Sequence, residues 1–127
     1  MPEFFYATTH EWIADFQGRW LIGLSEFAVG ELGDVTAVDL PDLGASFKKG
    51  DVMGAIESPK GYSDVYAPVD LTVSARNDEV INAPELVNQE PLGRGYFITV
   101  TVSDPAQVQA LMKKDAYDAF CAGSGGH

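Results

Sequence analysis

The sequence predicts one mainly β domain, a flattened barrel or sandwich of short antiparallel strands with two helices. Its 127 residues suit a single domain, and 46% are hydrophobic and 21% charged, as in a globular protein. Glycine and proline turn formers punctuate the chain at short intervals. Several segments between them alternate apolar and polar residues, as half-buried strands do. No internal repeat or linker divides the sequence.

The first half of the chain predicts strands around one short helix. Ser25 can cap a helix over residues 26–32, and Gly33 can end it. The segments rich in strand-forming residues, each predicted to be a strand, are 19–24, 35–40 and 52–57.

Two segments of the second half show strand alternation most clearly. Residues 71–75 alternate apolar and polar side chains and place Ala75 on the apolar face. In residues 96–102 every second side chain is apolar or aromatic, and two threonines lie on the opposite face. We therefore expect both segments to be strands with one face toward the core.

A C-terminal helix is expected after Asp104, which is a good N-cap, with Pro105 at the first helical position. Its apolar stripe is expected to pack on the sheet and comprises Val108, Leu111, Met112, Ala116, Ala119 and Phe120. The predicted domain spans residues 1–122 and is followed by a flexible tail at 123–127.

The net charge and the cysteine content restrict the expected partners and the expected cellular compartment. A net charge of -11 repels phosphate backbones, so we expect no nucleic-acid partner. No apolar run approaches the roughly 20 residues that cross a bilayer, so no membrane association is expected. The single cysteine, Cys121, excludes an internal disulfide and is interpreted as a packing residue. Together with the absence of a targeting pattern, this predicts a cytoplasmic monomer.

No catalytic or metal-binding motif stands out. The two histidines, His10 and His127, and one cysteine cannot form a zinc tetrad or a histidine-rich metal site. The sequence contains no phosphate-binding loop, nucleophile elbow or dinucleotide fingerprint. We therefore expect no catalytic residues and no metal, and a protein that is not an enzyme.

One turn does stand out, at residues 58–61, with the sequence Ser-Pro-Lys-Gly between two strand-like segments. Pro59 presets the backbone for a tight turn, and Gly61 suits its last position. Lys60 is then displayed at the tip, with its side chain directed outward. Its neighbours are polar or acidic, so it is no buried catalytic lysine. On local chemistry alone, an ordinary surface lysine fits this turn best.

Residues 57–68 read Glu-Ser-Pro-Lys-Gly-Tyr-Ser-Asp-Val-Tyr-Ala-Pro and resemble the ESxKxxSDxYxP segment of the glycine cleavage H protein family. This resemblance implies a biotinyl/lipoyl-carrier type of β fold and lipoic acid attached covalently to Lys60. The likeness extends over nearly the whole chain, through residues 6–12, 22–25, 32–35, 38–41, 84–88 and 115–117.

The resemblance also implies a function and site residues. The lipoyl-lysine arm would shuttle the aminomethyl group of glycine between glycine decarboxylase, aminomethyltransferase and dihydrolipoamide dehydrogenase, and the protein itself would catalyse nothing. Thr9, Glu11 and Asp64 match the residues that hold the loaded arm in a surface cleft, where carboxylates suit a cationic amine. Glu57 matches the residue that the lipoate-attaching enzyme recognises.

The chain departs from the family pattern at several positions, which keeps other functions open. Pro59 and Gly61 replace the usual valine and alanine and shape the turn, and Asp70-Leu71 replace a common Ser-Gly. These departures support an alternative resemblance to H-like lipoate-binding proteins of sulfur oxidation, the partners of a heterodisulfide-reductase-like complex. A third interpretation is an unlipoylated H-like scaffold or regulatory protein.

Overall fold

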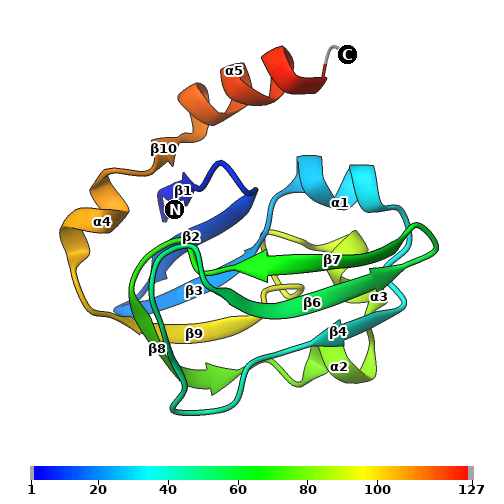
Figure 1. The fold of residues 1–127 in the computed structure, drawn as a ribbon, viewed down its shortest axis with the longest axis horizontal. Coiled ribbons are helices and arrows are strands. Elements are labelled where there is room, and N and C mark those ends of the chain that lie inside the picture. Colours follow the sequence, from blue (N-terminus) through cyan, green and yellow to red (C-terminus); the bar gives the residue numbers. More distant parts are fainter. Residues whose placement is uncertain (1, 126–127) are drawn as a thin grey trace.

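Two antiparallel sheets form the protein, and the main hydrophobic core lies between them (Figure 1). The structure is a computed structural model and describes residues 2–125. The predicted fold class, mainly β and shaped as a flattened sandwich with an internal and a C-terminal helix, is confirmed.

The elements have the following bounds. The larger sheet has, in spatial order, β10 (Met112–Lys113), β1 (Phe4–Tyr6), β2 (Glu11–Phe16), β3 (Arg19–Leu24), β9 (Ile98–Val102), β8 (Leu71–Arg76) and β5 (Ser46–Phe47). The smaller sheet has β4 (Ala37–Asp39), β6 (Val52–Ser58) and β7 (Gly61–Tyr66). The helices are α1 (Glu26–Leu32), α2 (Glu79–Asn82), α3 (Glu85–Gln89), α4 (Pro105–Gln109) and α5 (Lys114–Gly125).

The core joins the inner faces of both sheets. Ile22 and Ile98 from the larger sheet pack in one cluster with Ile56 from the smaller sheet, and all three side chains are buried. Burial of this apolar surface provides the main stabilisation, at about 25 cal/mol for each Å² removed from water. The β6–β7 hairpin is thereby fixed to the larger sheet through its inner face.

The predicted burial of Ala75 is wrong. Ala75 is exposed, although Leu71 and Val73 on the same strand are buried as predicted. The register between β8 and β9 shifts between Val73 and Ala75, where an extra residue forms a bulge. A bulge of this kind interrupts the alternation of faces and so turns the following side chain outward.

The internal helix α1 follows its sequence signals. The Ser25 side chain accepts a hydrogen bond from the Ala28 N–H at 3.1 Å, as an N-cap does. Gly33 ends the helix with a positive φ of 78°, a conformation that glycine adopts without steric cost. The end of the helix lies beside the tip of the β6–β7 hairpin (Figure 1).

The single C-terminal helix predicted after Asp104 is instead divided. Asp104 caps α4 as predicted, because its carboxylate accepts a hydrogen bond from the Ala106 N–H at 3.1 Å. The chain then forms β10, which pairs with the edge of β1, before α5 begins at Lys114. Pairing with β1 satisfies backbone groups that a continuous helix would satisfy internally, so the two structures compete for these residues.

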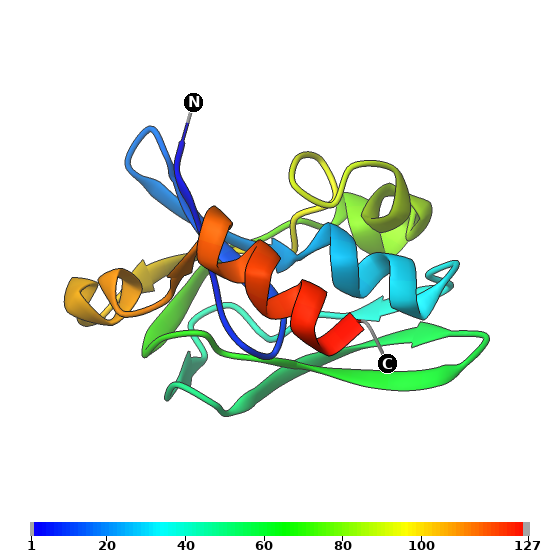
Figure 2. The ribbon, with the colours of Figure 1, turned by 90° about the horizontal axis from the view of Figure 1, so that it is seen from above.

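The break changes the buried face of the last helix. Within residues 114–123 of α5, Tyr117 and Cys121, four residues apart, are the buried positions, whereas Ala116 and Ala119 of the predicted stripe are exposed. Because β10 separates α4 from α5, a helical spacing counted from Val108 does not predict which side chains of α5 are buried. Figure 2 shows α5 crossing over β1.

The predicted tail overlaps this helix. Residues 123–125 belong to α5, and residues 126 and 127 lie outside the described part of the chain. Within residues 2–125, no helix has the length and apolar character needed to cross a membrane.

Candidate functional site

The β6–β7 hairpin places Lys60 at its tip. Ser58 pairs with Gly61, and Pro59 and Lys60 form the two-residue turn between them. Gly61 has a φ of 117°, which a residue with a Cβ adopts only with strain. The proline and the glycine therefore fit this tight turn, as the sequence indicated.

The Lys60 side chain does not extend freely into solvent. Its Nζ donates a hydrogen bond to the carbonyl oxygen of Glu31, in the last turn of α1, at 2.6 Å. That turn contains no basic residue of its own, and its free carbonyl groups favour a cation. The exposed amine is thus held against the end of α1.

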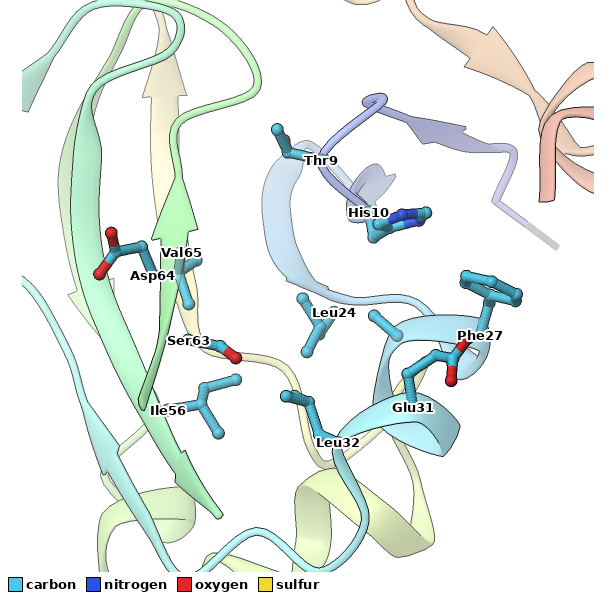
Figure 3. A pocket seen from close by; sticks show the side chains of 11 residues that line it. Thr9, His10, Leu24, Phe27, Glu31, Leu32, Ile56, Ser63, Asp64 and Val65 are labelled. Atoms are coloured by element: carbon cyan, nitrogen blue, oxygen red, sulfur yellow. The ribbon is translucent and has the colours of Figure 1, made fainter. Parts of the chain in front are cut away.

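A pocket of about 380 Å³ lies between α1, β7 and the turn that precedes β2 (Figure 3). Glu31, whose carbonyl oxygen binds Lys60, is one of the residues that line it. The polar residues around it are Thr9, His10, Glu31, Ser63 and Asp64. Its apolar walls come from Leu24, Phe27, Ala28, Leu32, Ile56 and Val65.

The three predicted cleft residues have different positions. Thr9 and Asp64 line the pocket and are exposed. Figure 3 shows the Asp64 carboxylate directed away from the cavity, whereas the neighbouring Ser63 side chain points toward it. This follows from the alternation of faces along β7. Glu11 does not line the pocket and is 0% exposed.

Both carboxylate oxygens of Glu11 accept hydrogen bonds. One accepts from the Thr9 hydroxyl, and the other accepts from the backbone N–H of Tyr66 at 3.0 Å. Burial raises the pKa of Glu11 to about 7, against the lowering effect of these two hydrogen bonds. Glu11 therefore connects the start of β2 to the end of β7 behind Thr9.

Glu57 lies on β6 near the tip, opposite Tyr62 of β7. Tyr62 is 78% exposed, and the Glu57 carboxylate raises the pKa of its hydroxyl. Asp70 lies in the connection to β8, at the end of β7 that is remote from Lys60. There it accepts a hydrogen bond from the Lys49 N–H at 2.8 Å, which joins the two loops that contain these residues.

The comparisons with known proteins agree with this geometry. A family model described as glycine cleavage H-protein matches residues 4–124. The chain is 44% identical to the glycine cleavage system H protein of Phenylobacterium zucineum over 119 residues, or 94% of this chain and 98% of that protein. It is 38% identical to that of Thermotoga maritima over 117 residues, or 92% and 94%. A crystal structure of a glycine cleavage system H protein from Mycobacterium marinum matches with a TM-score of 0.83 and 29% identity, covering 98% of both chains.

The chain belongs to the glycine cleavage H-protein family. The prediction of an H-protein-like lipoyl carrier is confirmed at this level. The relatives named above are all described as glycine cleavage system H proteins, and none of them supports the sulfur-oxidation alternative.

Some residues that line the pocket were not singled out from the sequence. His10 and Ser63 stand inside the family motifs but carried no assigned role, and Glu31 comes from a helix far from Lys60 in the chain. A positive φ of 80° at His10 is uncommon for a residue with a side chain, and no sequence pattern indicated it. Only the packing of α1 against the hairpin brings Glu31 to Lys60.

Proposed function

We propose that this protein is a non-catalytic carrier that bears lipoic acid on Lys60 and shuttles the aminomethyl group of glycine. Its partners would be a lipoate-attaching enzyme, glycine decarboxylase, aminomethyltransferase and dihydrolipoamide dehydrogenase. The observation that carries the proposal is the exposed Lys60 amine at a hairpin tip, held beside a pocket of about 380 Å³. A carrier requires both an accessible attachment point and a place for its arm.

The residues present fit the proposed group. The Lys60 amine is exposed and can form an amide, and the walls of the neighbouring pocket are mainly aliphatic and aromatic, which suits a hydrocarbon chain. When bound, lipoic acid supplies a disulfide that opens to accept a group and two electrons. The protein contributes by binding the arm and by keeping water from the bound group.

The polar side chains at the rim suit a cationic cargo. Asp64 and Glu31 supply carboxylates beside the pocket, and Thr9 supplies a hydroxyl. Charge-assisted hydrogen bonds to an ammonium group are stronger than neutral ones. We propose that Thr9 contacts the cargo and that Glu11 acts from behind Thr9, whose hydroxyl donates to it. The Asp64 carboxylate is exposed and is directed away from the cavity, and we propose that it turns toward the rim to contact the cargo.

The mass of the protein purified from its native host tests the attachment. We expect a lipoyl-sized increment that peptide mapping assigns to Lys60 alone. Lys60→Arg keeps the charge but cannot be acylated in this way, so its mass should show no increment, whereas Lys49→Arg, at another exposed lysine, should keep it. An unmodified Lys60 in the native protein would contradict the carrier function and favour an unlipoylated scaffold.

A further inference from the structure

A chain of short hydrogen bonds connects the last helix to the pocket. The Tyr117 hydroxyl of α5 lies 2.6 Å from the Ser25 hydroxyl and 2.6 Å from Nδ1 of His10. The Tyr117 ring is buried and stacks on Tyr6, with ring centroids 4.2 Å apart. His10 in turn lines the pocket beside Lys60. The proposed function does not by itself use Ser25 or Tyr117.

The direction of these hydrogen bonds follows from the donors available. Ser25 is 1% exposed, and its oxygen already accepts from the Ala28 N–H. Within residues 2–125, the only acceptor recorded for the Ser25 hydroxyl hydrogen is the Tyr117 oxygen. The Tyr117 hydrogen is then left for His10 Nδ1 at 2.6 Å, a stronger acceptor than the sulfur of Cys121, which also interacts with this hydroxyl. The opposite direction would leave the Ser25 hydrogen buried without an acceptor, which is unfavourable.

This direction determines the tautomer of His10. An Nδ1 atom that accepts from Tyr117 carries no hydrogen, so the neutral imidazole carries its hydrogen on Nε2. Burial lowers the pKa of His10, and the charge of Glu31 on α1 opposes this effect. Burial also raises the pKa of Tyr117, so the phenol keeps the hydrogen that it donates. Both effects favour neutral partners in this arrangement.

The backbone and the packing hold His10 in place. Its N–H donates to the Ala7 carbonyl at 2.9 Å, and its carbonyl accepts from the Ser25 N–H at 2.9 Å. These bonds maintain the uncommon positive φ of His10, a type of conformation that often occurs at functional sites. Phe27 of α1 and Phe120 of α5 pack near its ring, with centroids 5.2 and 5.9 Å away.

We infer that Tyr117 is a positioning residue through which α5 holds His10 as its Nε2–H tautomer, so that the pocket wall offers a hydrogen-bond donor to an acceptor atom of the arm on Lys60. The tautomer depends only on the contacts within the protein. The use of Nε2 by the arm rests on the proposed function. Two experiments therefore test the two steps separately.

Imidazole nitrogen NMR of the full-length, unmodified protein tests the tautomer. His127→Ala removes the only other histidine and leaves a single imidazole to observe. We expect a hydrogen on Nε2 and a pyridine-type Nδ1. In Tyr117→Phe the Nδ1 signal should move and the His10 pKa should change. Tyr6→Phe, which removes a stacked hydroxyl outside the hydrogen-bond chain, should leave both unchanged. A hydrogen on Nδ1, or identical responses in the two variants, would overturn the inference.

The reaction of the reduced lipoylated protein with a maleimide tests the use of this donor. We expect Tyr117→Phe and His10→Ala each to raise the rate about two- to tenfold, the effect of one lost hydrogen bond. His10→Asn, which retains an N–H donor, should restore a rate closer to that of the parent. Equal rates in parent and His10→Ala would overturn this step while leaving both the tautomer and the attachment at Lys60 standing.

Discussion

Glu11 is fully buried, and burial raises its pKa to about 7, so the carboxyl is only partly ionised at neutral pH. A buried carboxylate is unfavourable unless its oxygens are hydrogen-bonded, and here both oxygens are. One of these bonds stabilises the exposed edge of β7, because it takes up the Tyr66 N–H that has no strand beside it. Glu11 thus links the family motif around residues 9–12 to the hairpin that carries Lys60.

Replacing Glu11 with Gln should reduce the pH dependence of stability. The pKa of Glu11 is raised in the folded protein from 4.5 to about 7. Its protonation therefore stabilises the fold fully below pH 4.5, and this contribution is lost as pH rises through 7. The loss amounts to about 3 kcal/mol by pH 8. Glutamine keeps the shape and an acceptor for the Tyr66 N–H, so Glu11→Gln should gain stability relative to the parent as pH rises.

Urea unfolding at pH 4.5 and pH 8 measures this effect as the difference between variant and parent. Asp42→Asn, which neutralises an exposed carboxylate, serves as the control and should show little change in that difference. A constant difference for Glu11→Gln would show that the buried carboxyl does not titrate in this range.

Recognition by the lipoate-attaching enzyme can be tested at Glu57 and Tyr62. An enzyme that acylates the Lys60 amine must cover the hairpin tip, where Glu57 and Tyr62 face each other. A carboxylate and an exposed aromatic ring together suit an arginine side chain. Glu57→Gln should therefore lower kcat/KM for lipoylation about tenfold or more, the effect of losing a charged hydrogen bond. An unchanged kcat/KM would exclude Glu57 from recognition.

Among the elements, β2 and β3 illustrate how close packing depends on one small residue. The Trp12 indole lies over Gly23 on the neighbouring strand, and its Nε1 donates to the Pro91 carbonyl at 2.9 Å. A Cβ on Gly23 would lie 2.7 Å from a carbon of the Trp12 ring. The buried indole would have to move and lose this hydrogen bond.

Gly23→Ala should therefore destabilise the protein by about 1–3 kcal/mol, the usual cost of overpacking. Gly30→Ala is the matched control, because Gly30 is exposed in α1 and a Cβ there meets nothing within 4 Å. Alanine favours a helix by up to about 1 kcal/mol, so this variant should be slightly more stable. Denaturant midpoints distinguish the two outcomes, and equal midpoints would contradict the packing argument.

A comparison of individual helices and strands shows which of them could be predicted from the sequence. Helix α1 was predictable because Ser25 and Gly33 act within the chain segment itself, as local caps do. The break at β10 was not, because Met112 and Lys113 form a strand only by pairing with β1, more than a hundred residues earlier. Likewise, the turn sequence indicated Lys60 at a hairpin tip and the family resemblance indicated Thr9, whereas the contact of Glu31 with Lys60 depends on how α1 packs.

For the whole molecule, the charge of -11 is the dominant electrostatic property. The ion pairs found within residues 2–125 are largely at the surface, where each contributes little to stability. The excess negative charge is therefore available to act at a distance on partners. A carrier that visits several enzymes in turn needs fast association, and a long-range field raises association rates more than it raises affinity.

We expect the association rate with glycine decarboxylase to fall about tenfold or more when ionic strength rises from 0.01 to 1 M. The screening length shortens from about 30 Å to about 3 Å over this range. Stopped-flow measurements with lipoylated protein report this rate directly.

At low salt, Glu57→Gln near the tip should slow association more than Asp42→Asn, which removes the same charge farther from Lys60. At 1 M salt the two variants should associate at equal rates, because a screened field no longer distinguishes where the charge was. A rate independent of salt would mean that contact complementarity, rather than the field of the acidic surface, guides docking.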